Sequence, residues 1–173
     1  MSTGKPVLLG NASLIDIVMG NRVIVPQSDP DSLKVDCASD LVLDSQADGD
    51  LIFINAADSK NQAALRLHLT NGTMTQITVD DTVFPTAPSG TILVVDTKGD
   101  TVYAVKSDAF QSGGAYSASD SDGILGKVDL STGLVIPIVT GMQTPHGALF
   151  IPASSEDDDD HGDNQRGGPD PAR

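Results

Sequence analysis

The sequence is poor in cysteine and in basic side chains. Cys37 is the single cysteine among 173 residues, so one chain cannot form a disulfide or build a zinc site from several cysteines. Only 10 Lys and Arg side chains stand against 24 Asp and Glu side chains, which gives a formal net charge of -14. We therefore expect neither nucleic acid nor an anionic membrane as a partner, because both are bound by clustered positive charge.

Long apolar runs and common enzyme motifs are missing as well. No stretch approaches the roughly 20 apolar residues of a membrane span, and Gly10, Asn11 and Asp16 interrupt the amino-terminal run where a secretory signal would be apolar. The chain as written carries no export signal, so we expect a secreted or periplasmic location only if its start is truncated. No G-x-S-x-G, H-E-x-x-H, P-loop or dinucleotide motif is present, which argues against the common hydrolase, protease and nucleotide-dependent classes.

The last twenty residues differ in composition from the rest of the chain. The segment 154–173, SSEDDDDHGDNQRGGPDPAR, has seven acids, two arginines and no aliphatic side chain larger than that of alanine. Such a segment cannot bury enough apolar surface to offset the entropy lost on ordering it. We predict a disordered acidic carboxy-terminal tail.

Short runs rich in Val, Ile, Leu and Thr recur before that tail, separated by Gly, Asp, Asn and Pro. Several runs alternate and none keeps helical spacing over three turns, so the sequence predicts an all-β protein. The expected strands are 41–45, 51–55, 65–69, 74–79, 91–96, 101–105 and 134–139. The expected hairpin turns are Asp48-Gly49, Asn71-Gly72, Gly99-Asp100 and Ser131-Thr132-Gly133. The side chains expected to point inward are Val42, Ile52, Phe53, Val94 and Val95.

The strands fall into a repeat. LVLDSQADGDLIFIN from Leu41 and TVFPTAPSGTILVVD from Thr82 match at an offset of 41 residues, and ALFIP from Ala148 starts a third unit 66 residues later. We attribute the excess to a looped-out insertion at 107–123. A unit of about 40 residues with four short strands is typical of a β-propeller blade. The expected organisation is a partial blade in 1–37, propeller blades over 38–153 at about 40–80, at 81–143 and from 146 onward, and the tail over 154–173.

A family resemblance accompanies the repeat. SGTILVVDTKGDTVYAV followed by GKVDLSTGLVIPIVTGMQTPHGALF resembles the NHL-repeat and gluconolactonase-type six-bladed propellers, over about 38–152. The resemblance implies a rigid disc of sheets with loops around a central pore. It is more specific for this architecture than for any activity, because propellers with unrelated functions share such strand-turn-strand patterns.

The chain is too short to close such a ring. Six or seven blades need roughly 250 to 320 residues at about 40 to 45 each, so about three fit here. We expect an incomplete propeller, either the carboxy-terminal part of a longer protein, which we favour, or a chain that pairs with a second copy. A third alternative is an open stack of sheets capped by the amino-terminal segment. Open apolar sheet faces should then favour a homodimer or salt-sensitive association.

The candidate site residues follow from the resemblance. Asp96 ends 91–96 and Asn55 ends 51–55 at equivalent positions of the repeat, where the resembling lactonases hold a divalent cation, and their oxygens would suit calcium. His146, in TPHGALF, would lie at the pore rim as a base or a ligand. Ordinary turn capping and loop hydrogen bonding are the alternatives for all three. Asp120-Ser121-Asp122-Gly123 resembles the opening of a calcium loop but lacks its remaining acids, so we expect a flexible loop there.

Two functions remain open, and the sequence does not decide whether the chain is an enzyme. The first is a non-catalytic propeller scaffold that presents loops to a protein or carbohydrate partner. The alternative is a metal-dependent lactone hydrolase or lyase of the gluconolactonase type. The first requires no residue that the sequence lacks, whereas the second requires a full set of pore ligands of which only two can be matched.

Overall fold

A computed structural model describes residues 4–154 and confirms the all-β prediction. This part of the chain forms thirteen strands in three sheets and no helix, so it holds no helix that could cross a membrane. The predicted acidic tail lies outside the described residues from 155 onward. The strands are β1 Ser13–Asp16, β2 Arg22–Ile24, β3 Pro30–Val35, β4 Leu41–Ser45, β5 Asp50–Asn55, β6 Ala63–His68, β7 Asp81–Val83, β8 Gly90–Asp96, β9 Thr101–Ser107, β10 Ala115–Ser119, β11 Ile124–Val128, β12 Val135–Thr140 and β13 Pro145–Pro152.

The six-stranded sheet contains the first predicted unit. Its order is β2-β1-β6-β5-β4-β3, and β3 to β6 form a continuous antiparallel meander. The predicted turn at Asp48-Gly49 joins β4 to β5. The prediction of a strand at 74–79 is wrong, and β3 is the fourth strand of the meander instead. Ile77 and Val79 are buried in the core, but the backbone around them makes only an isolated bridge between Thr70 and Gln76.

The amino-terminal segment covers the outer face of this sheet. β1 pairs in parallel with β6 and antiparallel with β2. Leu14 and Val25 of this segment pack with Ile52 and Ile54 of β5 in one buried cluster. Both faces of β5 are therefore covered, which explains why Ile52 and its neighbour Phe53 are both buried as predicted.

The four-stranded sheet overturns the predicted insertion. Its order is β12-β11-β10-β7, all antiparallel, and β10 lies inside the stretch 107–123 that we expected to loop out. All five residues of β10 are buried. Its Ala and Ser side chains carry little apolar signal, which is why the strand reads as a loop in the sequence. The segment 120–123 is the turn that joins β10 to β11.

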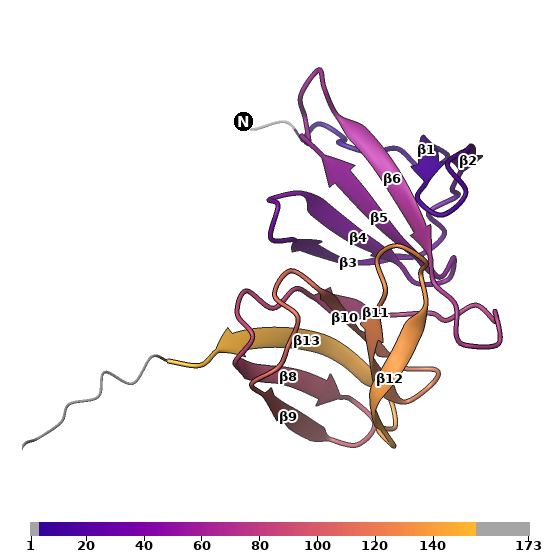
Figure 1. Cartoon of the computed structure of the whole chain (residues 1–173). Coiled ribbons are helices and arrows are strands. Elements are labelled where there is room, and N and C mark those ends of the chain that lie inside the picture. Colours follow the sequence, from indigo (N-terminus) through magenta and orange to yellow (C-terminus); the bar gives the residue numbers. More distant parts are fainter. Residues whose placement is uncertain (1–3, 155–173) are drawn as a thin grey trace, which may run out of the picture.

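The three-stranded sheet is assembled from distant parts of the chain. β8 and β9 form the predicted hairpin around Gly99-Asp100, and β13 pairs antiparallel with β8. The β8–β9 hairpin thus leaves the four-stranded sheet between β7 and β10 and joins the last strand of the described chain. Figure 1 shows this sheet beside β10, β11 and β12, and the six-stranded sheet on their other side.

The three sheets stack face to face, with the four-stranded sheet in the middle. One core cluster joins it to the six-stranded sheet through residues such as Phe53 and Ala115. A second joins it to the three-stranded sheet, where Val94 packs with Tyr116 and Leu125. Val42 and Val94 are fully buried as predicted, but Val95 is 42% exposed, so its inward prediction is wrong. Successive strand residues point to opposite faces, and residues 4–154 leave the Val95 face of the three-stranded sheet exposed.

The adjacent valines Val94 and Val95 give a matched test of the stack. Val94→Ala should lower the free energy of unfolding by about 2 kcal/mol, because it removes buried methyl groups and leaves a cavity between two sheets. Val95→Ala should cost about 0.5 kcal/mol or less at protein concentrations where the chain is monomeric, since its side chain is exposed within one chain. Urea denaturation of both variants measures the difference. Equal losses would contradict the placement of the middle sheet on the Val94 side.

Candidate functional site

The three sheets meet around β7, where two adjacent aspartates lie. β3 and β13 both contact β7. The Asp81 carboxylate, 7% exposed, pairs with the Lys34 ammonium of β3 at 2.9 Å. It also accepts a hydrogen bond from the Ala148 amide of β13 at 2.7 Å. Asp81 therefore links all three sheets.

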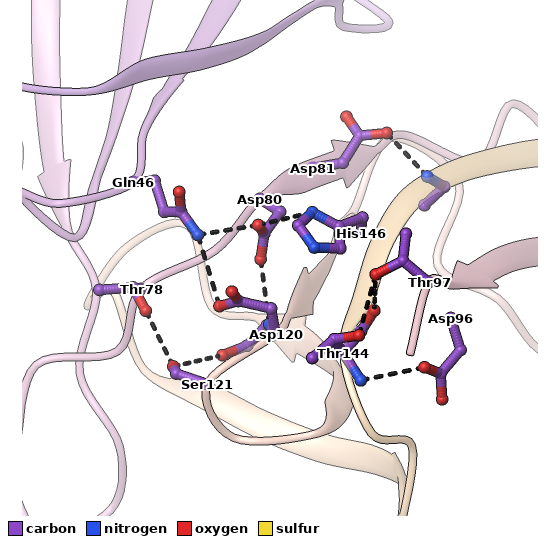
Figure 2. A network of polar contacts seen from close by, with 12 residues as sticks. Gln46, Thr78, Asp80, Asp81, Asp96, Thr97, Asp120, Ser121, Thr144 and His146 are labelled. Carbon is purple, nitrogen blue, oxygen red and sulfur yellow. Dashed lines mark hydrogen bonds and ion pairs between the residues drawn. The ribbon is translucent and has the colours of Figure 1, made fainter. Parts of the chain in front are cut away.

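Asp80, directly before β7, binds a second group of partners. Its Oδ1 accepts from Gln46 Nε2 at 2.8 Å and lies 3.0 Å from His146 Nδ1. Its Oδ2 accepts from the Asp120 amide at 3.0 Å. Gln46 Nε2 also lies 3.4 Å from Asp120 Oδ1, so the four residues form one polar cluster at the ends of several strands (Figure 2). We call Gln46, Asp80, Asp120 and His146 the junction cluster.

Asp80 is the member of the junction cluster whose surroundings favour its protonated form. Burial raises the pKa of Asp80 to about 6, the Asp120 amide opposes this rise, and the Asp120 carboxylate adds to it. The Asp80 side chain is 2% exposed, whereas that of His146 is 42% exposed. The cluster thus combines a desolvated carboxylate with an imidazole that solvent can reach, which suits either proton transfer or cation binding.

Asp44 of β4 is a second buried acid beside this junction. It is fully buried, and burial raises its pKa to about 8, while a hydrogen bond from Thr82 opposes that rise. The Thr82 hydroxyl donates to Asp44 Oδ2 at 2.9 Å and contacts the Ser117 hydroxyl at 2.8 Å. Asp44 Oδ1 has no hydrogen-bond partner among the described residues. Asp44 is therefore mostly protonated at neutral pH.

The structure brings one of the three sequence-predicted site residues into the junction cluster. His146 lies in it, at the start of β13, although its catalytic role stays a prediction. Asn55 ends β5 in the six-stranded sheet, where its Nδ2 donates to Asp40 Oδ2 at 2.6 Å. Asp96 ends β8 in the three-stranded sheet, so the middle sheet lies between the two residues expected to share a metal.

Asp96 caps the segments around it. Its carboxylate accepts hydrogen bonds from the amides of Gln143 at 2.7 Å, Thr144 at 3.0 Å and Gly99 at 2.8 Å. These donors, that of Gln143 first, lower its pKa. The side chain thus holds the β8–β9 turn to the segment before β13, as the turn-capping alternative describes. Calcium binding by Asn55 and Asp96 stays a prediction.

Sequence reasoning missed Asp80 and Gln46 and treated Asp120 only as part of a weak calcium-loop pattern. The three residues lie at 46, 80 and 120, and only the pairing of distant strands brings them together. The pair Asp80-Asp81 directly after the strand-like segment Ile77-Thr78-Val79 is the available signal. Two consecutive acids at the start of a strand predict a solvent-exposed turn, because the sequence does not show that this strand lies between two other sheets.

A scan of protein-family models and searches of curated proteins and of solved structures find no match to this chain.

Asp44 should make stability fall as pH rises. Its folded pKa of about 8 exceeds the unfolded value, so the folded state holds a proton that the unfolded state releases, and stability is lost up to pH 8. Asp44→Asn removes this dependence. The unfolding free energy of the variant minus that of the wild type should therefore increase by up to about 1.4 kcal/mol for each pH unit. Denaturant titrations between pH 5.5 and 9 measure this shift.

Asp96→Asn is the matched control for that experiment. The pKa of Asp96 is lowered, so its stabilising contribution is fully present above the unfolded value and is lost only on acidification. Its replacement should destabilise the protein by an amount that stays constant between pH 5.5 and 9. A constant gap for Asp44→Asn as well would contradict the raised pKa of Asp44.

Proposed function

We propose that the chain is part of a β-propeller that serves as a non-catalytic binding scaffold. Two meanders support this proposal, β3 to β6 in one sheet and β7 with β10 to β12 in the next, since four antiparallel strands make one propeller blade. The strands β3, β7 and β13 lie together where the sheets meet, as the inner strands of neighbouring blades do. The β8–β9 hairpin with β13 is the start of a third blade-like unit.

The observation that carries the proposal is the difference between the two ends of the stack. The amino-terminal segment covers one end. At the other end, the outer face of the three-stranded sheet exposes apolar side chains. They are Val95 at 42%, Val102 at 60%, Leu149 at 58% and Ile151 at 46%. We call these four residues the open face.

The open face is one continuous surface. Val95 pairs with Val102 across β8 and β9, and Leu149 pairs with Leu93 across β13 and β8. Paired residues point to the same side of a sheet, and so do residues two apart on one strand. Contiguous apolar surface of this kind marks an interaction site. In a propeller it is the surface on which the next blade packs.

The proposed role is to hold loops rigidly toward a protein or carbohydrate partner once the open face is covered by another sheet. The enzymatic alternative, a metal-dependent lactone hydrolase or lyase, gains no support from its two matched ligands, because the Asn55 amide is hydrogen-bonded to Asp40 and the Asp96 carboxylate to three backbone amides. The scaffold requires only the stack, its turns and an assembly surface.

Light scattering of the isolated chain tests the assembly surface. We expect a dimer or a larger species, and more association at high salt, because salt screens the repulsion between chains of net charge -14. The double substitution Val102→Lys with Leu149→Lys should shift the protein toward monomer. The control pair Met19→Lys with Met74→Lys changes residues that are 74% and 80% exposed outside the open face and should leave association unchanged.

A monodisperse species of 17.9 kDa at both low and high salt would contradict the proposed role of the open face. So would equal effects of the two double substitutions, because association would then depend on added charge and not on this surface.

A further inference from the structure

Asp80 differs in its partners from four of the five other buried acids of the described chain, the exception being Asp44 with its Thr82 hydroxyl. Asp16 and Asp50 each lie 2.9 Å from the Arg66 guanidinium, and Asp81 lies 2.9 Å from the Lys34 ammonium. Asp96 accepts three backbone N–H groups. Asp80 is equally buried, yet its side-chain partners are an imidazole and an amide, and the neighbouring Asp120 adds a second negative charge. Residues 4–154 thus place no permanent cation against this pair of carboxylates.

The geometry of these groups matches a metal site. One ligand atom from each of Asp80, Asp120 and His146 can be chosen so that all three lie within 4.8 Å of one another. His146 Nδ1 and Asp80 Oδ1 are 3.0 Å apart. Two atoms that each lie about 2.0 to 2.2 Å from one zinc ion are separated by roughly 3 to 3.5 Å. Small side-chain rotations would therefore let the three atoms share an ion.

We propose that Asp80, Asp120 and His146 bind a divalent first-row transition cation, with two carboxylate oxygens and one imidazole nitrogen as ligands. This site is independent of the proposed scaffold function and shares neither Asn55 nor Asp96 with the calcium site expected from the sequence. Calcium and magnesium take oxygen ligands, whereas a mixed oxygen and imidazole set suits zinc, cobalt or nickel. Three protein ligands leave one position for water or a small ligand.

The fold supports the three ligands from separate elements. Asp80 precedes β7, Asp120 follows β10 and His146 lies in β13, so the site exists only when the sheets are assembled. Gln46 is a positioning residue, because its amide donates to Asp80 and lies near Asp120 (Figure 2). Such outer partners orient metal ligands. His146 is 42% exposed while Asp80 is 2% exposed, which gives an ion a path from solvent on the His146 side.

The three histidines of the chain allow a complete control series. We would titrate the full-length protein and its variants His146→Ala, His68→Ala and His161→Ala with Zn²⁺ by isothermal calorimetry, in a buffer that does not chelate zinc. His68 pairs with Asp50 at 2.8 Å, away from the site. His161 lies in the acidic segment beyond the described residues and reports binding there.

We expect one zinc equivalent bound by the wild type, by His68→Ala and by His161→Ala with the same Kd. His146→Ala and a second variant, Asp120→Asn, should weaken binding at least about tenfold. Zinc should also raise the Tm of the wild type and not that of these two variants, while any effect of calcium should be the same in the wild type and both variants. Circular dichroism before titration verifies that each variant retains its β structure.

An unchanged Kd in both His146→Ala and Asp120→Asn would overturn the proposal. Loss of binding in His161→Ala alone would overturn it too, because the zinc would then be held by the acidic segment. Absence of zinc binding by the wild type would also overturn the proposal.

Discussion

Two adjacent carboxylates at the start of β7 constrain the whole arrangement. Asp80 and Asp81 are 2% and 7% exposed, and burying a charge without partners costs several kcal/mol. The partners come from every sheet: Lys34 and Gln46 from the six-stranded sheet and the turn after β4, Asp120 from the four-stranded sheet, and Ala148 and His146 from β13. The sheets must stay in one relative position for both acids to remain satisfied.

Packing on both sides of the middle sheet follows from that position. Alternate residues of β10 face opposite neighbours, so Ala115 joins one core cluster while Tyr116 and Ala118 join the other. Two polar side chains remain between the sheets, Thr82 and Ser117. Their hydroxyls hydrogen-bond to each other, and that of Thr82 donates to Asp44.

The parts of the fold that depend on neighbouring residues could be predicted from the sequence. The hairpins β4–β5 and β8–β9 have apolar runs on both sides of short polar turns, and both form as expected. Of the hairpin β11–β12, the turn and the second strand were predicted and the first strand was not. β10 could not be predicted, because Ala and Ser carry little apolar signal. Nor could the pairing of β13 with β8, which joins segments about 50 residues apart. The exposure of Val95 could not be predicted either, because it depends on the same pairing of distant segments.

The candidate site likewise has one residue that could be predicted from its local sequence and three that could not. His146 was identifiable because its proton affinity and its position beside Pro145 and Gly147 are local properties. Asp80, Gln46 and Asp120 acquire their meaning only from the junction, where burial changes the chemistry of an ordinary acid. A site made from three sheets has no spacing in the sequence that would reveal it.

Hydrogen exchange at two backbone amides tests the central role of Asp80 and Asp81 most directly. The amides of Ala148 and Asp120 donate to these carboxylates and not to a neighbouring strand. If the junction holds the sheets together, both amides should exchange only through global unfolding, with the same free energy and denaturant dependence as the amide of Leu51 in the core. Fast exchange at Ala148 and Asp120, while Leu51 stays protected, would show that the sheets are held together without the aspartate pair.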